Sequence, residues 1–254
     1  MGNYELEYYS NIANWDFSKI KYKEEVLTNW NYFDEIRKHS NENSLCLDLG
    51  TAGGENVLNK YPDVGMVIAT DFSEDMISTA KLNAKNHKKK NVKFTVMDNL
   101  KMKVPDELFD LVSARHTVID AKGIYKCLVP GGFLVIEGVD KKDCWDLKEL
   151  FGQGQAYHDE IAISQKDYKD LVNAGFSKVD LTQILVNEYY ETPEDLMALL
   201  LKAPILDDFS EITGLTKSHL EVIDKNLFEQ YVNTHSTKKG ILLKRVLYGI
   251  VAQK

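Results

Sequence analysis

The chain has 254 residues, of which 31 are Lys or Arg and 39 are Asp or Glu, giving a formal net charge of −8. Its 44% hydrophobic and 28% charged residues match a globular protein and exclude a disordered one, while 15 Gly and 5 Pro exclude collagen-like chains. The acidic balance disfavours nucleic acid or an anionic membrane as the main ligand, since both require a basic surface. The length fits one large domain, or one domain with a cap.

The three cysteines, Cys46, Cys127 and Cys144, are an odd number without CxxC or metal-ligand spacing. This pattern predicts reduced, buried thiols, a cytoplasmic location and no metal site. The most apolar stretch, 241–252, contains Lys244 and Arg245 and is shorter than the roughly 20 residues that cross a membrane. We therefore expect no membrane span.

Hydrophobic periodicity divides the chain into three parts. In residues 1–43, Val26, Trp30, Phe33 and Ile36 form one apolar stripe, which predicts an N-terminal helical cap. From residue 44 to about 140, strands alternate with helices, a pattern typical of βαβ units and a parallel sheet covered on both faces. The strands are expected at 44–49, 65–70, 92–97, 109–114 and 132–138, and the helices at 53–61, from Ser73 onward, and at 117–128.

The C-terminal part predicts a helix from Ser164 to Gly175, a strand at 178–186 and a final strand near 241–251. Between the last two lies an insertion, 188–238. Thr192 has the signature of a helix start, with Pro193 after it, and Thr216 opens a second expected helix. An insertion of this length with its own helices is typical of a lid over a substrate.

Polar residues follow three successive strands. The strand ending at Leu49 runs into a glycine turn, Gly50-Thr-Ala-Gly-Gly54, whose backbone N–H groups a ligand can approach closely. Asp71 ends the next strand, where an acid can accept hydrogen bonds from ribose hydroxyls, and Asp98 follows the third. Open α/β sheets bind ligands at this carboxyl edge. Taken singly, Asp48 could instead cap a helix; the G-x-G-x-x-G spacing of dinucleotide sites is absent.

With these motifs, residues from about 44 to 140 resemble the class I S-adenosylmethionine-dependent methyltransferases, specifically the family with a type-11-like methyltransferase domain. The family's D-x-G-x-G-x-G motif is similar to the segment 48–54, in which Ala52 replaces the middle glycine, so we expect a tilted turn. A second motif resembles 69–76, and the turn into the fifth strand, 128–134, is similar to a third. The resemblance implies a Rossmann-like, doubly wound seven-stranded α/β sheet whose last strand is antiparallel.

The resemblance also implies S-adenosylmethionine as cofactor, with S-adenosylhomocysteine as product, and a set of residues that bind it. The methionine part would lie on Asp48 and Gly50, the ribose on Asp71, and the adenine near Asp98 and Asn99. The complete set carried over from the family is Asp48, Gly50, Thr51, Ala52, Gly53, Asp71, Phe72, Met76, Asp98, Asn99, Leu100 and Ala114.

Methyl transfer from a sulfonium mainly requires alignment of the nucleophile and exclusion of water. Arg115 and His116, after the fourth strand, are the candidate catalytic residues. His116 could serve as a general base, because histidine titrates near neutral pH, and Arg115 could hold an anionic group of the acceptor. Alternatively, His116 caps the next helix or packs on the cofactor.

Three functions remain open. The first is methyl transfer to an O, N or C atom of a small molecule; the others are an rRNA or tRNA methyltransferase and a non-catalytic S-adenosylmethionine-binding protein. No N/D-P-P-Y/F motif follows the fourth strand, which disfavours the nucleic-acid amino methylases that use it. The basic run His87–Lys90 lies at the amino edge, opposite the cofactor, where we interpret it as a solvated turn.

Overall fold

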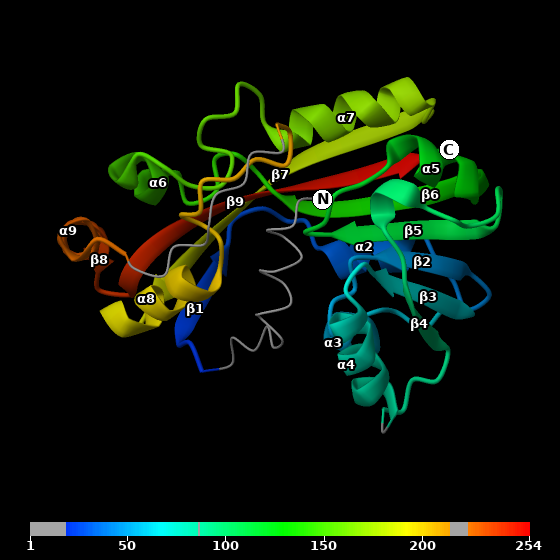
Figure 1. Ribbon diagram of the computed structural model, residues 1–254, viewed down its shortest axis with the longest axis horizontal. Helices are drawn as coiled ribbons and strands as arrows, with labels where there is room; N and C mark the ends of the chain where they lie inside the picture. The colour runs from blue at the N-terminus through cyan, green and yellow to red at the C-terminus, as the bar shows by residue number, and fades with distance from the viewer. Residues whose placement is uncertain (1–18, 86, 214–222) are drawn as a thin grey trace. The chain divides into compact units, whose positions relative to one another are not determined.

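The computed structural model describes residues 19–85, 87–213 and 223–254 (Figure 1). Its chain divides into two compact units. One comprises residues 30–138, 164–182 and 248–254, and the other comprises residues up to 29, 139–163 and 183–247. We call the first the cofactor unit and the second the variable unit.

The cofactor unit is built on parallel strands in the order β6-β5-β2-β3-β4. Their bounds are β2 Leu45–Leu49, β3 Met66–Asp71, β4 Val92–Val96, β5 Phe109–Arg115 and β6 Leu128–Val139. The helices are α2 Tyr32–Lys38, α3 Glu55–Asn59, α4 Glu74–Lys85, α5 Ala121–Cys127 and α7 Ile163–Ala174, with a 3-10 turn, η1, at Asn99–Lys101.

The strands of this unit are apolar because helices cover them. Leu47, Val67 and Leu111, from three neighbouring strands, have no exposed surface. The helix after β3 begins as its sequence predicts: Ser73 Oγ accepts a hydrogen bond from the Met76 amide at 3.3 Å. Acids in the first turn of α4 face the positive end of the helix dipole.

The last strand, β9 (Gly240–Gln253), is antiparallel to β6, as expected. Within the cofactor unit, the Lys254 amide donates to the Gly132 carbonyl at 3.0 Å, while a Cβ on Gly138 would contact the ring of Tyr248. Residue numbers therefore rise along one strand as they fall along the other. This arrangement confirms the doubly wound sheet with a reversed final strand.

The variable unit holds β1 Tyr22–Val26, α6 Trp145–Phe151, α8 Pro193–Lys202, α9 Lys225–His235 and the short β8 Ser236–Thr237. β1 pairs antiparallel with β7 (Lys178–Tyr190), placing Tyr22 opposite Tyr190. Thr192 caps α8 by accepting the Asp195 amide at 3.1 Å, as the sequence predicts.

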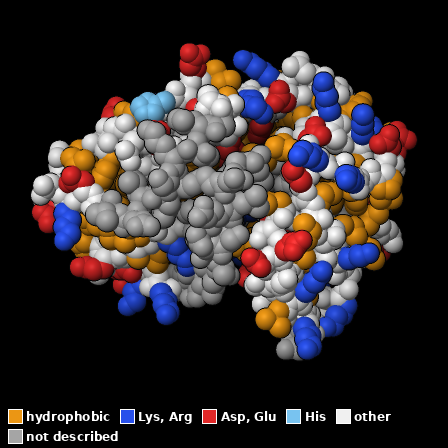
Figure 2. Space-filling view, in the orientation of Figure 1, with side chains coloured by type: hydrophobic (Ala, Val, Ile, Leu, Met, Phe, Trp, Pro, Cys, Tyr) orange, Lys and Arg blue, Asp and Glu red, His pale blue; other side chains and the backbone are white. Residues whose placement is uncertain are grey.

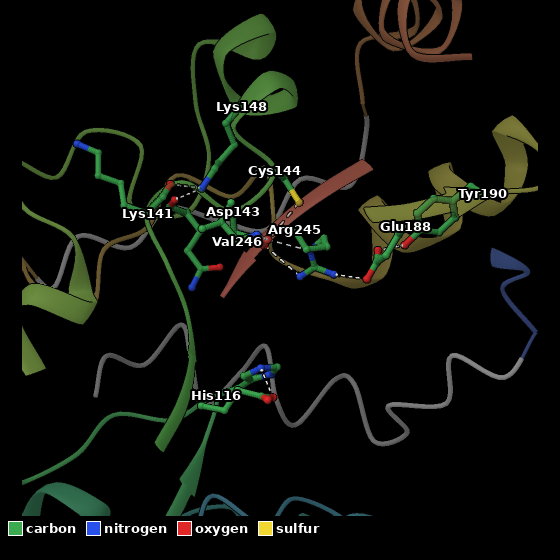
Figure 3. Close-up of polar contacts among 11 residues, drawn as sticks. His116, Lys141, Asp143, Cys144, Lys148, Glu188, Tyr190, Arg245 and Val246 are labelled. Atoms are coloured by element: carbon green, nitrogen blue, oxygen red, sulfur yellow. Dashed lines mark hydrogen bonds and ion pairs between the residues drawn. The ribbon is translucent and has the colours of Figure 1, made fainter. Parts of the chain in front are cut away.

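A buried ion cluster lies in the core of the variable unit (Figure 3). The Arg245 guanidinium donates from Nε and Nη2 to the two oxygens of Asp143 at 2.9 and 3.0 Å, and from Nη1 to Glu188 at 3.0 Å. Tyr190 donates to the other oxygen of Glu188 at 2.6 Å. One cation thus joins two buried carboxylates.

Two expectations need correction, and a third falls outside the described residues. Residues 1–18 lie outside the described part, but Tyr22–Val26 is a strand and only Tyr32–Lys38 is helical, so the apolar stripe predicted the wrong structure at Val26. Val26 is 58% exposed, because it ends an edge strand instead of facing a core. The described residues form nine strands instead of seven, the additions including β1 and β8. Residues 214–222, with the helix expected from Thr216, lie outside the described part; the described helix begins at Lys225.

Cys46, Cys127 and Cys144 are free and buried, as predicted. In the described residues, no helix is both long and apolar enough to cross a membrane.

Candidate cofactor and acceptor site

The parallel pairing brings three predicted segments to one sheet edge. Leu49 pairs with Thr70, and Asp71 pairs with Val96, so β2, β3 and β4 end side by side. The Thr51 amide donates to the Thr70 carbonyl at 2.8 Å, which ties the glycine turn to the end of β3.

Left-handed backbone shapes the glycine turn. Gly50 has φ +73°, and a Cβ there would lie 2.7 Å from the Cβ of Thr117, so only glycine fits. Ala52, at the position of the family's middle glycine, adopts φ +48°. A side chain in this region costs about 1–2 kcal/mol. Ala52 therefore keeps the left-handed backbone that a glycine would take, at the expense of strain within the turn.

Asp71 joins the turn to β3. Its Oδ2 accepts the Ala52 amide at 2.9 Å, and its Oδ1 accepts the Ser73 amide at 3.0 Å. Burial raises the pKa of Asp71, whereas these backbone N–H groups lower it. A carboxylate has about four acceptor positions, so acceptor capacity remains for a ligand's hydroxyl groups.

Asp98 and Asn99 follow β4 and have different roles. Asp98 caps η1 by accepting the Leu100 amide at 2.9 Å. Asn99 is buried; its Nδ2 donates to Thr117 Oγ1 at 3.0 Å, while its Oδ1 has no hydrogen-bond partner among the described residues. A buried acceptor without a partner is costly unless a ligand donor satisfies it.

Asp48 is buried beneath the turn. Ser113 Oγ donates to its Oδ1 at 2.8 Å, and Ser113 lies 3.0 Å from the Tyr61 hydroxyl. Burial raises the pKa of Asp48 to about 7, although Ser113 and Thr51 act to lower it. The residue that caps α3 is Gly54, so the alternative role of Asp48 as a helix cap is wrong.

The remaining predicted cofactor residues differ in exposure. Met76 and Ala114 are almost fully buried, Thr51 is buried, Phe72 is partly exposed and Leu100 is 42% exposed. The Gly53 carbonyl accepts from Asn83 Nδ2 at 2.9 Å, which anchors the turn to α4. Packing thus accounts for Met76 and Ala114, and their contact with a cofactor stays a prediction.

Arg115 and His116, at the end of β5, share one carboxylate, and Figure 3 labels His116. Glu137 on β6 lies directly across from Arg115, whose Nε donates to Glu137 Oε1 at 2.6 Å. His116 Nε2 lies 3.5 Å from the same oxygen. The cap of α5 is Asp120, so the alternative that His116 caps this helix is wrong.

Glu137 is the site residue that sequence reasoning missed. Burial acts to raise its pKa, but the hydrogen bond from His116 and the charge of Arg115 outweigh burial and set the Glu137 pKa at about 2. It is therefore ionised at neutral pH. The signal was an acid inside the otherwise apolar strand GFLVIEG, which only a polar partner on the neighbouring strand explains.

Residues 40–185 match the family model of the methyltransferase domain, over more than half of the chain. The chain belongs to the methyltransferase-domain family. This match confirms the resemblance to the class I methyltransferases and, with it, S-adenosylmethionine as their cofactor. No curated protein matches the chain in sequence.

Solved structures confirm the fold of this methyltransferase. A putative methyltransferase from Bacillus halodurans is 16% identical, with a TM-score of 0.51, covering 87% of this chain and 98% of its own. The YcgJ protein from Bacillus subtilis is 15% identical, with a TM-score of 0.56 and coverages of 87% and 96%. Phosphoethanolamine N-methyltransferase 2 from Haemonchus contortus, in complex with S-adenosylmethionine, is 19% identical, with a TM-score of 0.51 and coverages of 89% and 52%.

The residues at the carboxyl edge fit S-adenosylmethionine. The left-handed turn leaves no side chain on Gly50 between β2 and Thr117. The remaining acceptor positions of Asp71 suit a ribose diol, and the unpartnered Oδ1 of Asn99 suits an amino group.

Proposed function

We propose that this methyltransferase binds S-adenosylmethionine along the edge formed by Gly50, Asp71 and Asn99 and transfers its methyl group to an O, N or C atom of a small molecule. One observation carries the proposal. Thr117 packs against Gly50 and accepts a hydrogen bond from Asn99, so the segment holding Arg115 and His116 lies against the cofactor turn.

Each polar residue at the edge has a distinct binding role in the proposal. Asp71 accepts hydrogen bonds from the ribose hydroxyls while retaining its bond from the Ala52 amide. Asn99 accepts from the adenine amino group, and the positively charged methionine end favours the ionised form of Asp48, whose pKa burial raises to about 7 in the free protein. When bound, the cofactor supplies a methyl group already activated by its sulfonium.

His116 removes the proton of an acceptor that arrives protonated. Glu137 orients the imidazole ring and stabilises the imidazolium that forms, because its carboxylate stays charged at neutral pH. Arg115 keeps Glu137 in place through its 2.6 Å hydrogen bond. This bond uses the Nε of Arg115, so in the proposal its terminal nitrogens also hold an anionic group of the acceptor.

Two observations about charge support a small molecule as the acceptor. The whole chain carries a formal charge of −8. The basic run His87–Lys90 lies between the end of α4 and the start of β4, where the chain returns to the amino end of a parallel strand. An RNA held on these lysines would not present its bases to the methyl group.

Methyl-labelled S-adenosylmethionine tests this function directly. The protein is incubated with the labelled cofactor and either a small-molecule cell extract or total RNA, and label is followed into each product. The proposal predicts label in the small-molecule fraction, and much less label there with Asp71→Asn. Label in RNA alone would support an rRNA or tRNA methyltransferase, and cofactor binding without any transfer would support a non-catalytic binding protein.

A further inference from the structure

A second, basic site lies in the cofactor unit, away from the glycine turn. A pocket of about 570 Å³, open to solvent, is found where the C-terminal half of α4 meets β4. Four lysines line it: Lys81, Lys85, Lys90 and Lys93. In Figure 2, Lys and Arg side chains gather around the end of the helix that Figure 1 labels α4. Over residues 19–85, 87–213 and 223–254, no acidic side chain lines this pocket.

Ion pairs within the described part of the chain do not neutralise the positive charge of the pocket. Lys90 Nζ reaches only the Lys85 carbonyl, at 3.4 Å. Among the residues that the structure describes, no carboxylate forms an ion pair with any of the four lysines. Lys81 and Lys85 lie one turn apart on α4, a spacing at which like charges destabilise a helix. The arrangement therefore favours an anion from outside the chain.

The rest of the pocket lining is apolar, and one of these apolar side chains contacts the cofactor turn. Ala84, Val92 and Phe94 complete the lining. Phe94 is 6% exposed, and its Cζ would lie 2.7 Å from a Cβ on Gly54, so its ring packs directly against this glycine. Gly54 has φ +78° and caps α3 at the end of the turn. One side chain thus lines the basic pocket and supports the glycine turn.

We propose that the pocket lined by Lys81, Lys85, Lys90 and Lys93 binds a small anion that carries several phosphate groups, and that the occupied pocket stabilises the cofactor turn through Phe94. The stabilising effect on the cofactor turn rests on the proposed cofactor site.

Phosphate is favoured over carboxylate by the number of lysines, because a phosphate chain places several negative charges close together. Lysine binds phosphate as a point charge. Four positive charges match a di- or triphosphate better than a single phosphate. The phosphates could belong to a free polyphosphate or to a nucleotide, whose base would lie on Val92 and Phe94.

Calorimetry with inorganic tripolyphosphate tests the site without the cofactor. We expect the intact protein to bind it and Lys81→Glu/Lys85→Glu to bind at least about tenfold more weakly, because two attractive charges become repulsive. Lys122→Glu/Lys126→Glu is the matched control, since these lysines are also exposed and one turn apart on α5. Equal weakening by both pairs, or no binding by the intact protein, would overturn the proposal.

Two further measurements identify the ligand and test whether its binding affects the cofactor site. Tighter binding of ATP than of tripolyphosphate would assign the phosphates to a nucleotide, and equal binding to a free polyphosphate. Tighter binding of a single-stranded RNA decamer than of either would overturn the small-anion site.

With tripolyphosphate bound, S-adenosylmethionine should bind about fivefold more tightly, and Phe94→Leu should abolish this effect. An unchanged affinity for S-adenosylmethionine would overturn the coupling alone, because tripolyphosphate binding is measured separately.

Discussion

The Glu137 carboxylate lies 3.5 Å from His116 Nε2, although 21 residues separate them in the chain. Parallel pairing of β5 with β6 brings them together, because Arg115 lies directly across from Glu137 in the register. His116 itself has φ +51°, and its amide donates to the Glu137 carbonyl at 2.8 Å, so both its backbone and its side chain are held by one residue. The candidate base is therefore positioned by the sheet.

Replacing Glu137 by Gln should lower kcat by about 10- to 100-fold while changing cofactor affinity little. The imidazolium of His116 loses its counter-charge, so the acid limb of the pH–rate profile should also move to lower pH. Steady-state kinetics from pH 5 to 9 check both effects, with the exposed Glu160→Gln as control. An unshifted profile with normal kcat would show that Glu137 is purely structural.

Replacing Asp48 by Asn should change how the stability of the cofactor-free protein depends on pH. Because burial raises the folded-state pKa of Asp48 from 3.8 to about 7, the folded protein holds this proton at pH values where the unfolded chain has lost it. The contribution of Asp48 to the free energy of unfolding therefore falls as the pH rises from about 4 to about 7. The loss is at most about 1.4 kcal/mol for each pH unit by which the folded and unfolded pKa values differ. Urea unfolding at pH 5 and pH 8 should show a smaller loss in Asp48→Asn. The same loss in both proteins would refute this role.

Ala52→Gly should increase the free energy of unfolding by about 0.5–1 kcal/mol. The glycine removes the left-handed strain at φ +48° but adds freedom to the unfolded chain, which offsets part of the gain. Ala198→Gly, at an exposed position within α8, is the control and should lower stability by about 1 kcal/mol. Destabilisation by both substitutions would mean that the turn at Ala52 is not strained.

Arg245→Met should destabilise the variable unit by about 3–5 kcal/mol, because it leaves Asp143 and Glu188 buried without their cation (Figure 3). The neighbouring Lys244 forms a 2.8 Å ion pair with Asp146, but its side chain is 57% exposed. Lys244→Met should therefore cost under about 1 kcal/mol. Chemical unfolding measures the free energy of unfolding of both variants. Equal losses of stability would contradict the claim that the buried ion pairs matter more than the exposed one.

The cofactor half of the fold could be predicted from the sequence because its signals are local. Apolar strands, the glycine turn and the acids at strand ends follow one another within about 55 residues, from Leu45 to Asn99, and parallel pairing then brings them together. Helix starts at Ser73 and Thr192 also depend on hydrogen bonds within one turn.

The features that were missed depend on contacts between distant segments. Tyr22–Val26 forms a strand because it pairs with β7, which lies more than 150 residues later in the chain. The local hydrophobic periodicity, which predicts a helix, is therefore misleading at this segment. Glu137 and Arg245 look out of place in apolar strands until their partners on other elements are known. The bond between Asp71 and the Ala52 amide likewise needs the register of β2 against β3.

Calorimetric titration of S-adenosylmethionine into the intact protein and Asp71→Asn tests the cofactor site most directly. The intact protein should bind, and Asp71→Asn should bind about 10- to 100-fold more weakly, because a charged acceptor of the ribose hydroxyls becomes neutral. The exposed Asp63→Asn should bind normally, and circular dichroism should show all three folded. Equal affinity in Asp71→Asn, or no binding by the intact protein, would contradict the assignment of this edge to the cofactor.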